Sequence, residues 1–262
     1  MTPVVPVPAA TVMLVRDGAD GMEVFMVRRT GKAVFVPSAH VFPGGKVDEV
    51  DADGQRLDEL CPGLDDAEAS RRMGIPTGGL ASWVAAIREC FEEAGVLLAR
   101  DRTGHHPQFI DEPVVARYDE HRRAVHAGTR GLAEVCEREG LVLAVDELQY
   151  FGHWITPEPS PRRFDTRFFV ARAPVDQEPL HDGSETVASV WIRPSQALAD
   201  YETGTFAIIT PTIFMLRSIS RFDDADDLVA AAAQAAVEGP AFLEVGYPHD
   251  LGHRVALTSL ER

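Results

Sequence analysis

The 262 residues of this chain suffice for one large domain, or for one domain that carries a substantial insertion. Apolar residues make up 45% of the sequence, enough to bury a core, which excludes a globally disordered chain. Aspartate and glutamate number 41 against 25 lysines and arginines, and the resulting net charge of -16 disfavours binding to a nucleic acid polymer. A small anionic ligand stays compatible with this charge, because a divalent cation can bridge the two.

Cysteine usage and the first residues bear on the compartment. The three cysteines are a sparse, odd-numbered set, which is a poor disulfide framework and fits a reducing environment. Residues 1–15 hold three prolines and no leading basic residue, unlike a signal peptide, and no apolar run is long enough to span a bilayer. We therefore expect a cytoplasmic protein without a membrane partner, for which a homodimer stays open.

The first half of the chain predicts a hairpin, an insertion and a helix. Residues 11–16 and 22–28 are β-type runs separated by a turn rich in aspartate and glycine, and residues 34–41 are extended up to a break at Pro43. Residues 51–80 are acidic and punctuated by glycine and proline, which favours a long surface insertion. Ser82 is placed to cap a helix over residues 83–94, and Gly95 is placed to end it.

The second half alternates strands and helices. Residues 112–139 have helical composition with a break near 128–131, and residues 148–155, 163–171 and 186–192 are predicted strands. Residues 194–201, 210–220 and 226–238 are predicted helices, with no internal repeat and no linker. This mixture predicts one layered α/β or α+β domain.

Three carboxylates share one face of the helix predicted over residues 83–94. Successive residues advance by about 100°, so Glu93 lies about 40° to one side of Glu89 and Glu92 about 60° to the other. The opposite side collects an apolar stripe that would face a core, made of Trp83, Ile87, Cys90, Phe91 and Ala94.

Two interpretations of this acidic face are open from the helix alone. It is either a solvated surface or a cation site. Carboxylates four residues apart repel each other by about 0.2–0.5 kcal/mol when exposed, and by more when partly buried. Arg88 is the only cation on the segment. A divalent ion would relieve the repulsion, and hard oxygen ligands suit Mg²⁺ or Mn²⁺.

The residues around these carboxylates resemble the sequence box of the Nudix hydrolase family. That box runs Gly, five residues, Glu, seven residues, then Arg-Glu-U-x-Glu-Glu-x-Gly-U, where U is a bulky aliphatic residue. Residues 88–96 read Arg-Glu-Cys-Phe-Glu-Glu-Ala-Gly-Val and match every fixed position except the first U, which is Cys90. Upstream lies Phe42-Pro43-Gly44-Gly45.

The first half of the box departs from the family pattern. Counted from Gly45, the position of the first Glu is held by Asp51, and 36 residues separate Asp51 from Arg88 instead of seven. The chain is similar to the coenzyme A diphosphatase subgroup, in which an insertion interrupts the box. The stretches Ser38-Ala39-His40-Val41-Phe42-Pro43-Gly44-Gly45 and Arg162-Arg163-Phe164-Asp165-Thr166-Arg167-Phe168-Phe169 also look like that subgroup.

The resemblance implies a fold and roles for individual residues. The fold is a Nudix-like α/β/α sandwich with a mixed β-sheet, a helical insertion at about 52–81 and extra C-terminal helices, all in one domain over residues 1–262. By analogy, Glu89 and Glu93 bind the catalytic metal ion, Glu92 joins the same cluster, and Arg88 orients the carboxylates. A carbonyl of Gly44 or Gly45 completes the metal shell, since glycine permits a close approach.

Further candidates lie outside the box. Glu185 occupies a loop in which many family members place a general base or an extra ligand, and a surface glutamate at a turn is the alternative. Arg28, Arg29, Arg163 and Arg167 are candidate contacts to substrate phosphates, with ordinary surface charge as the alternative. Trp154 and Phe164 are candidates to stack on a base, although a core position is the simpler explanation of each.

The resemblance implies hydrolysis of a diphosphate bond in a small nucleoside diphosphate derivative, with Mg²⁺ or Mn²⁺ as cofactor. Coenzyme A or an acyl-coenzyme A is the substrate that the subgroup implies, and NADH, ADP-ribose and nucleotide sugars are the alternatives. A different class of function is a non-catalytic module that binds a nucleotide. Such modules often lose a carboxylate of the box, whereas Arg88 and all three glutamates are present here.

Overall fold

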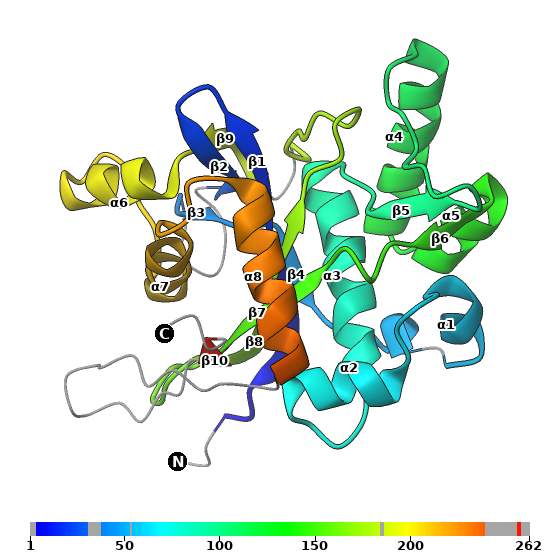
Figure 1. The fold of residues 1–262 in the computed structure, drawn as a ribbon, viewed down its shortest axis with the longest axis horizontal. Coiled ribbons are helices and arrows are strands. Elements are labelled where there is room, and N and C mark those ends of the chain that lie inside the picture. Colours follow the sequence, from blue (N-terminus) through cyan, green and yellow to red (C-terminus); the bar gives the residue numbers. More distant parts are fainter. Residues whose placement is uncertain (1–3, 31–37, 53, 184–185, 239–255, 258–262) are drawn as a thin grey trace.

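The computed structural model describes residues 4–30, 38–52, 54–183, 186–238 and 256–257, and all structural statements below refer to these residues (Figure 1). An eight-stranded mixed sheet forms the centre, and helices lie on both of its faces. The predicted α/β/α sandwich with a mixed sheet is confirmed.

Strand β1 (Val7–Gly18) organises the sheet. It pairs in parallel with β8 (Phe164–Arg172) along one side. On the other side, its first half pairs with the antiparallel β4 (Gly44–Lys46) and its second half with the antiparallel β2 (Gly21–Arg29). The two partners of β1 therefore diverge, and a gap opens between them at the middle of the strand.

The remaining strands extend the sheet outward. Strand β7 (Gln149–Ile155) joins β8, while β3 (His40–Val41) and β9 (Thr186–Ile192) pair with β2. The short β10 (Ala256–Leu257) pairs with β7. A separate two-stranded sheet joins β5 (Ala99–Asp101) to β6 (Leu141–Leu143), and neither of these strands was predicted from the sequence.

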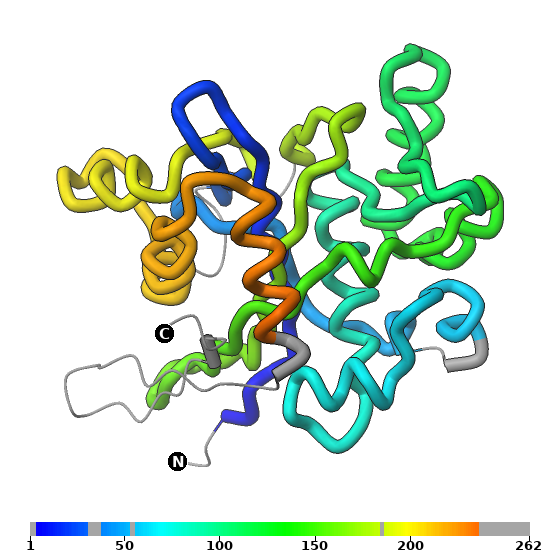
Figure 2. Tube along the Cα trace, viewed as in Figure 1, coloured from blue at the N-terminus to red at the C-terminus, as the bar shows by residue number. Residues whose placement is uncertain are grey.

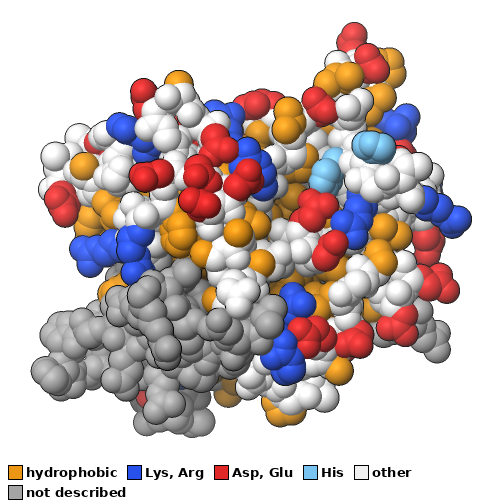
Figure 3. Space-filling view, in the orientation of Figure 1, with side chains coloured by type: hydrophobic (Ala, Val, Ile, Leu, Met, Phe, Trp, Pro, Cys, Tyr) orange, Lys and Arg blue, Asp and Glu red, His pale blue; other side chains and the backbone are white. Residues whose placement is uncertain are grey.

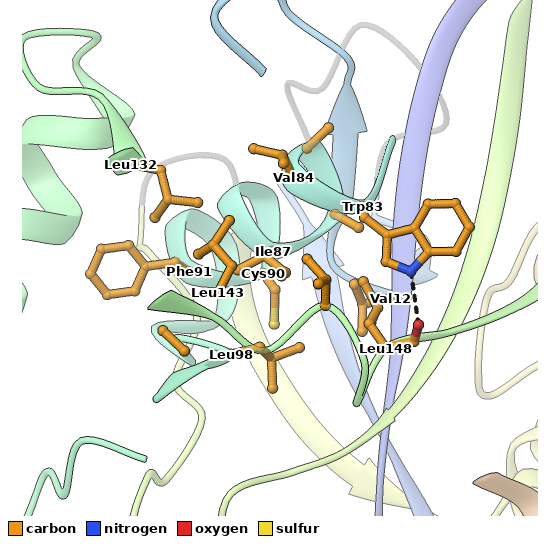
Figure 4. Packing of buried hydrophobic residues seen from close by; sticks show 14 of the residues in the cluster. Val12, Trp83, Val84, Ile87, Cys90, Phe91, Leu98, Leu132, Leu143 and Leu148 are labelled. Carbon is orange, nitrogen blue, oxygen red and sulfur yellow. Dashed lines mark hydrogen bonds between the residues drawn. The ribbon is translucent and has the colours of Figure 1, made fainter. Parts of the chain in front are cut away.

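Both faces of β1 are buried, because successive side chains of a strand point to opposite sides. Val12 and Leu14 belong to the core under helix α3 (Gly79–Ala94), and Met13 and Val15 belong to a second core under α7 (Thr210–Ile219) and α8 (Ala225–Glu238). Figure 4 shows the first core, where Trp83 of α3 also donates a hydrogen bond to the carbonyl of Leu148 at 2.9 Å. The predicted apolar stripe of α3 is buried here as a whole.

The insertion in the box is helical, as the family resemblance implied, but it is not confined to the surface as its composition favoured. It forms a 3₁₀ turn (Glu49–Ala52) and helices α1 (Gly54–Leu60) and α2 (Asp66–Met73), which Figure 2 draws in blue and cyan. One side of the segment is buried in the same core as α3, through Leu57, Leu60, Cys61, Leu64, Ala69 and Met73. The acidic, glycine and proline residues of the insertion occupy its exposed side and its turns. Because they outnumber the few apolar residues between them, the buried stripe is hard to recognise from composition.

The start of α3 differs from the prediction. The helix begins at Gly79, one turn before residue 83, and Ser82 is a buried residue within it. The Asp66 carboxylate accepts hydrogen bonds from the N–H groups of Gly78 and Leu80 at 2.9 and 3.0 Å, and Ser70 Oγ accepts one from Gly79. The insertion therefore caps α3 in place of Ser82. Gly95 ends the helix as predicted, with φ of 71°.

The other helices agree with the sequence-based expectations. Helices α4 (Glu112–His126) and α5 (Leu132–Glu139) flank the predicted break, and α6 (Pro194–Glu202), α7 and α8 follow the last long strand. None of the helices among the described residues is long and apolar enough to cross a membrane. Of the segment predicted to be extended over residues 34–41, residues 34–37 lie outside the described residues.

Candidate active site

The acidic face of α3 lies against the two glycines of β4. The backbone N–H of Gly44 donates a hydrogen bond to Glu93 Oε2 at 2.9 Å. A Cβ atom added to Gly45 would lie 2.5 Å from the Glu89 carboxylate, so only glycine lets strand and helix approach this closely. The structure thus joins Gly44, Gly45 and the glutamates of α3 at one point, although 40 or more residues separate them in the sequence.

Arg88 fixes two of the three carboxylates on this acidic face of α3. Its guanidinium donates to Glu89 Oε1 at 2.8 Å and to Glu92 Oε1 at 3.0 Å, and also to the carbonyl of Lys46 at 2.8 Å. Its side chain is only 7% exposed. The planar guanidinium can serve several acceptors at fixed angles, which fixes the rotamers of both carboxylates.

Asp51, which lies at the start of the insertion, also binds Arg88. Its two carboxylate oxygens accept hydrogen bonds from Arg88 Nε and Nη2 at 2.8 and 2.9 Å, and its side chain is 1% exposed. It also accepts a hydrogen bond from the N–H of Asp48. The tertiary structure therefore brings Asp51 beside Arg88 despite the residues inserted between them.

The site carries more negative charge than Arg88 balances. The pKa of Glu89 is raised to about 7, mainly by burial and also by the neighbouring Glu92 and Asp51 carboxylates, against the opposing effect of Arg88. Repulsion of this kind favours a bound cation, which would return the Glu89 carboxyl to its charged form.

The carboxylates do not converge on one coordination point. Among the described residues, no three His, Cys, Asp or Glu side chains are arranged as a metal site. Glu89 and Glu92 each direct an oxygen at Arg88, and Glu93 directs one at Gly44. The donor set nevertheless fits a hard divalent ion, since it consists of carboxylate oxygens. The side chains of Glu89 and Glu92 are only 13% and 11% exposed, and the pKa of Glu89 is raised.

A cleft of about 490 Å³ opens over these residues. Arg88 and the three glutamates line one side of it, and residues of β1, β7 and β8 line another. Trp154 and Phe164 both border the cleft, and Trp154 is 5% exposed and belongs to the core beneath it, as the core interpretation of this residue expects. The cleft therefore joins an acidic end to an aromatic wall.

Only one of the four candidate phosphate-binding arginines reaches the cleft. Arg29 lines it, whereas Arg28 is exposed and lies outside its lining. Phe164, Thr166 and Phe168 line the cleft, so Arg167, which alternates with them on β8, points to the opposite face of the sheet. Arg163 instead donates hydrogen bonds to the carbonyls of Thr156 and Val4 and to Glu158. Glu185 lies outside the described residues.

Among the charged or titratable side chains that line the cleft, three were not selected from the sequence, namely Lys46, Asp48 and His126. Lys46 follows Gly45 directly, and strand alternation from Gly44 would have assigned it to the same side as Gly44. His126 lies in the last turn of α4, and its Nδ1 is 3.5 Å from Glu92 Oε2. No local pattern points to His126, because the packing of α4 against α3 brings it there.

The fold and this site define a protein of the Nudix class. The family model described as the NUDT19 Nudix domain matches residues 7–219. The chain belongs to the Nudix hydrolase family, as the resemblance of residues 88–96 implied.

Named relatives extend this comparison. Acyl-coenzyme A diphosphatase NUDT19 of Gallus gallus is 30% identical over 251 residues, which cover 83% of this chain and 66% of that protein. The protein of the same name from Homo sapiens is also 30% identical, over 84% of this chain and 66% of its own length. This chain thus spans slightly under two thirds of the length of these relatives.

A solved structure supports the fold. The crystal structure of a NUDIX hydrolase from Alicyclobacillus acidocaldarius is similar with a TM-score of 0.72 and 27% sequence identity. The similarity covers 88% of this chain and 97% of that one.

Proposed function

We propose that this protein hydrolyses the diphosphate bond of coenzyme A or of an acyl-coenzyme A, with Mg²⁺ or Mn²⁺ as cofactor. The carrying observation is that Glu89 and Glu92, held by Arg88, and Glu93, held by the Gly44 N–H, together line the acidic end of a 490 Å³ cleft. The names of the curated relatives support the choice of substrate class. The aromatic side of the cleft suits a nucleotide base.

The residues of the chain have separable roles in this reaction. Glu89, Glu92 and Glu93 would hold the ion, which when bound neutralises the diphosphate oxygens and lowers the pKa of a water molecule. Arg88 fixes the carboxylates of Glu89 and Glu92, and the Gly44 N–H fixes Glu93. Such fixed geometry contributes to catalysis because little reorganisation is needed when the substrate arrives.

The test is a substrate panel with product analysis. Coenzyme A, a short acyl-coenzyme A, NADH, ADP-ribose and a nucleotide sugar would each be incubated with Mg²⁺ or Mn²⁺. We expect adenosine 3′,5′-bisphosphate and a phosphopantetheine from the coenzyme A species. Glu93→Gln should reduce their turnover at least about 100-fold, as expected when a charge that binds the catalytic ion is removed.

Glu59→Gln is the matched control, since it makes the same chemical change at an exposed position of α1 and should leave turnover unchanged. Turnover of NADH without turnover of any coenzyme A species would contradict the proposed substrate. Nucleotide binding without turnover of any substrate on the panel would favour the non-catalytic module instead.

A further inference from the structure

A row of side chains crosses four strands at the floor of the cleft. Lys46 of β4 pairs with Ala9 of β1, Ala9 pairs with Thr166 of β8, and Thr166 pairs with Trp154 of β7. All four residues line the cleft. Because residues directly opposite each other on paired strands point to the same face, these four form a continuous surface.

The neighbouring row lies beside the carboxylates. Gly44 pairs with Thr11 and Thr11 pairs with Phe168, and all three line the cleft as well. Gly44 is the residue whose N–H binds Glu93, so this row borders the site proposed for the diphosphate. The row of Lys46 lies two residues further along the strand, about 7 Å away.

Lys46 is a cation for which the described residues supply no ion-pair partner. No salt bridge within the described part of the chain involves it, and it is exposed on the cleft. Arg88, by contrast, is committed to Asp51, Glu89 and Glu92, and His126 lies beside Glu92. In a cleft dominated by carboxylates, a lysine without a partner is suited to an anionic group of the ligand.

The other end of the same row is aromatic. Trp154 ends the row and is 5% exposed, so it closes the floor, while the half-buried Phe164 lies next to Thr166 on the same face of β8. Because the side chains of Ala9 and Thr166 are small, they project little into the cleft between Lys46 and Trp154. Four adjacent strands span about 14 Å, which accommodates a base at one end and a phosphate at the other.

We propose that this row binds a nucleoside whose ribose carries a phosphomonoester, with Phe164 against the base at the end that Trp154 closes and Lys46 against the monoester. This inference rests on the proposed function and deepens it, since the adenosine of coenzyme A carries a 3′-phosphate in addition to its diphosphate. The diphosphate lies at the neighbouring row, so Lys46 discriminates coenzyme A from diphosphates that lack the third phosphate.

The test measures binding by titration calorimetry in the absence of a divalent ion. Wild-type protein should bind adenosine 3′,5′-bisphosphate about 10- to 100-fold more tightly than adenosine 5′-monophosphate, the range of a charge-assisted hydrogen bond. Lys46→Met should remove this preference, while Lys46→Arg should keep most of it. Phe164→Leu should weaken both ligands by the same factor of about 10, because base stacking does not depend on the 3′-phosphate.

Arg102→Met controls for net charge, since Arg102 is exposed and does not line the cleft, and it should keep the wild-type preference. A wild-type protein that binds both ligands equally, or neither, overturns the inference. So does a Lys46→Met variant that weakens both ligands by the same factor, which would assign Lys46 to the 5′-phosphate. If wild-type protein prefers adenosine 3′,5′-bisphosphate but hydrolyses no coenzyme A species, the proposed function is contradicted and this inference is not.

Discussion

At the scale of single residues, Arg88 is the most constrained side chain of the site. Its guanidinium meets three carboxylates and one carbonyl while it is 7% exposed. A buried cation of this kind is stable only while its acceptors remain, because the cost of removing it from water is large. Asp51 supplies two of those acceptors and is itself buried.

We predict that Asp51→Asn lowers the free energy of unfolding by about 3 kcal/mol, at the lower end of the range for breaking a buried ion pair, because Glu89 and Glu92 still face Arg88. Urea denaturation measures this change. Asp48→Asn is the control, since Asp48 is 58% exposed and 3.5 Å from Arg88 Nη2, and it should cost less than about 0.5 kcal/mol. Equal losses in both variants would refute the role assigned to Asp51.

The raised pKa of Glu89 makes stability depend on pH. The folded-state pKa of about 7 exceeds the ordinary value of 4.5, so the folded protein binds more protons than the unfolded chain between these values. The contribution of this group to stability is therefore lost as pH rises through that window. Between about pH 5 and pH 7.5 the loss amounts to roughly 2 kcal/mol.

Glu89→Gln removes the titrating group, so its free energy of unfolding should rise relative to wild type by that amount over the same pH interval. Denaturation of the metal-free proteins at several pH values measures the difference. A difference that stays constant with pH would show that Glu89 titrates at its ordinary value.

At the scale of elements, the insertion supports the helix that carries the site. Asp66 of α2 caps the first N–H groups of α3, and the apolar side of α1 and α2 packs into the same core. The insertion is therefore part of the structure that positions Glu89, Glu92 and Glu93.

We predict that Asp66→Ala lowers the free energy of unfolding by about 1–2 kcal/mol, the usual cost of losing a helix cap. Ser82→Ala, at the cap position that the sequence favoured, should cost clearly less, because Ser82 is inside the helix. Thermal or urea unfolding of the two variants decides between the caps. A larger loss for Ser82→Ala would contradict the observed helix start.

At the scale of the whole molecule, the net charge of -16 means that specific cation binding and general screening by salt both stabilise the fold and are hard to tell apart. On the face shown in Figure 3, acidic and basic side chains are interspersed. Added salt therefore screens the repulsion between like charges over the whole surface, whereas a specifically bound ion acts only at its binding site. Any test of metal binding must hold the ionic strength constant.

We predict that Mg²⁺ at 100 times its dissociation constant stabilises the wild-type protein by about 2.7 kcal/mol relative to NaCl of equal ionic strength. Glu93→Gln should show little of this stabilisation, because one of the proposed ligands has lost its charge. Differential scanning calorimetry measures both proteins. Equal stabilisation of wild type and variant would indicate screening alone.

Local sequence determined the helix, its buried stripe and its acidic face, because each depends on residues within a few turns of one another. Residues 88–96 also identified the family, and period-two and helical patterns predicted the hairpin, β7, β8 and β9 and all the later helices. The very short strands β5 and β6 were not predicted, since three residues are too few for a periodic pattern.

Tertiary structure alone decided which distant residues complete the site. The pairing of Asp51 with Arg88, the capping of α3 by Asp66 and the row from Lys46 to Trp154 each join segments that have no common local pattern. It also directed Arg163 and Arg167 away from the cleft. Sheet register and helix packing fix these contacts, and both depend on distant segments closing around the two cores on either side of the sheet.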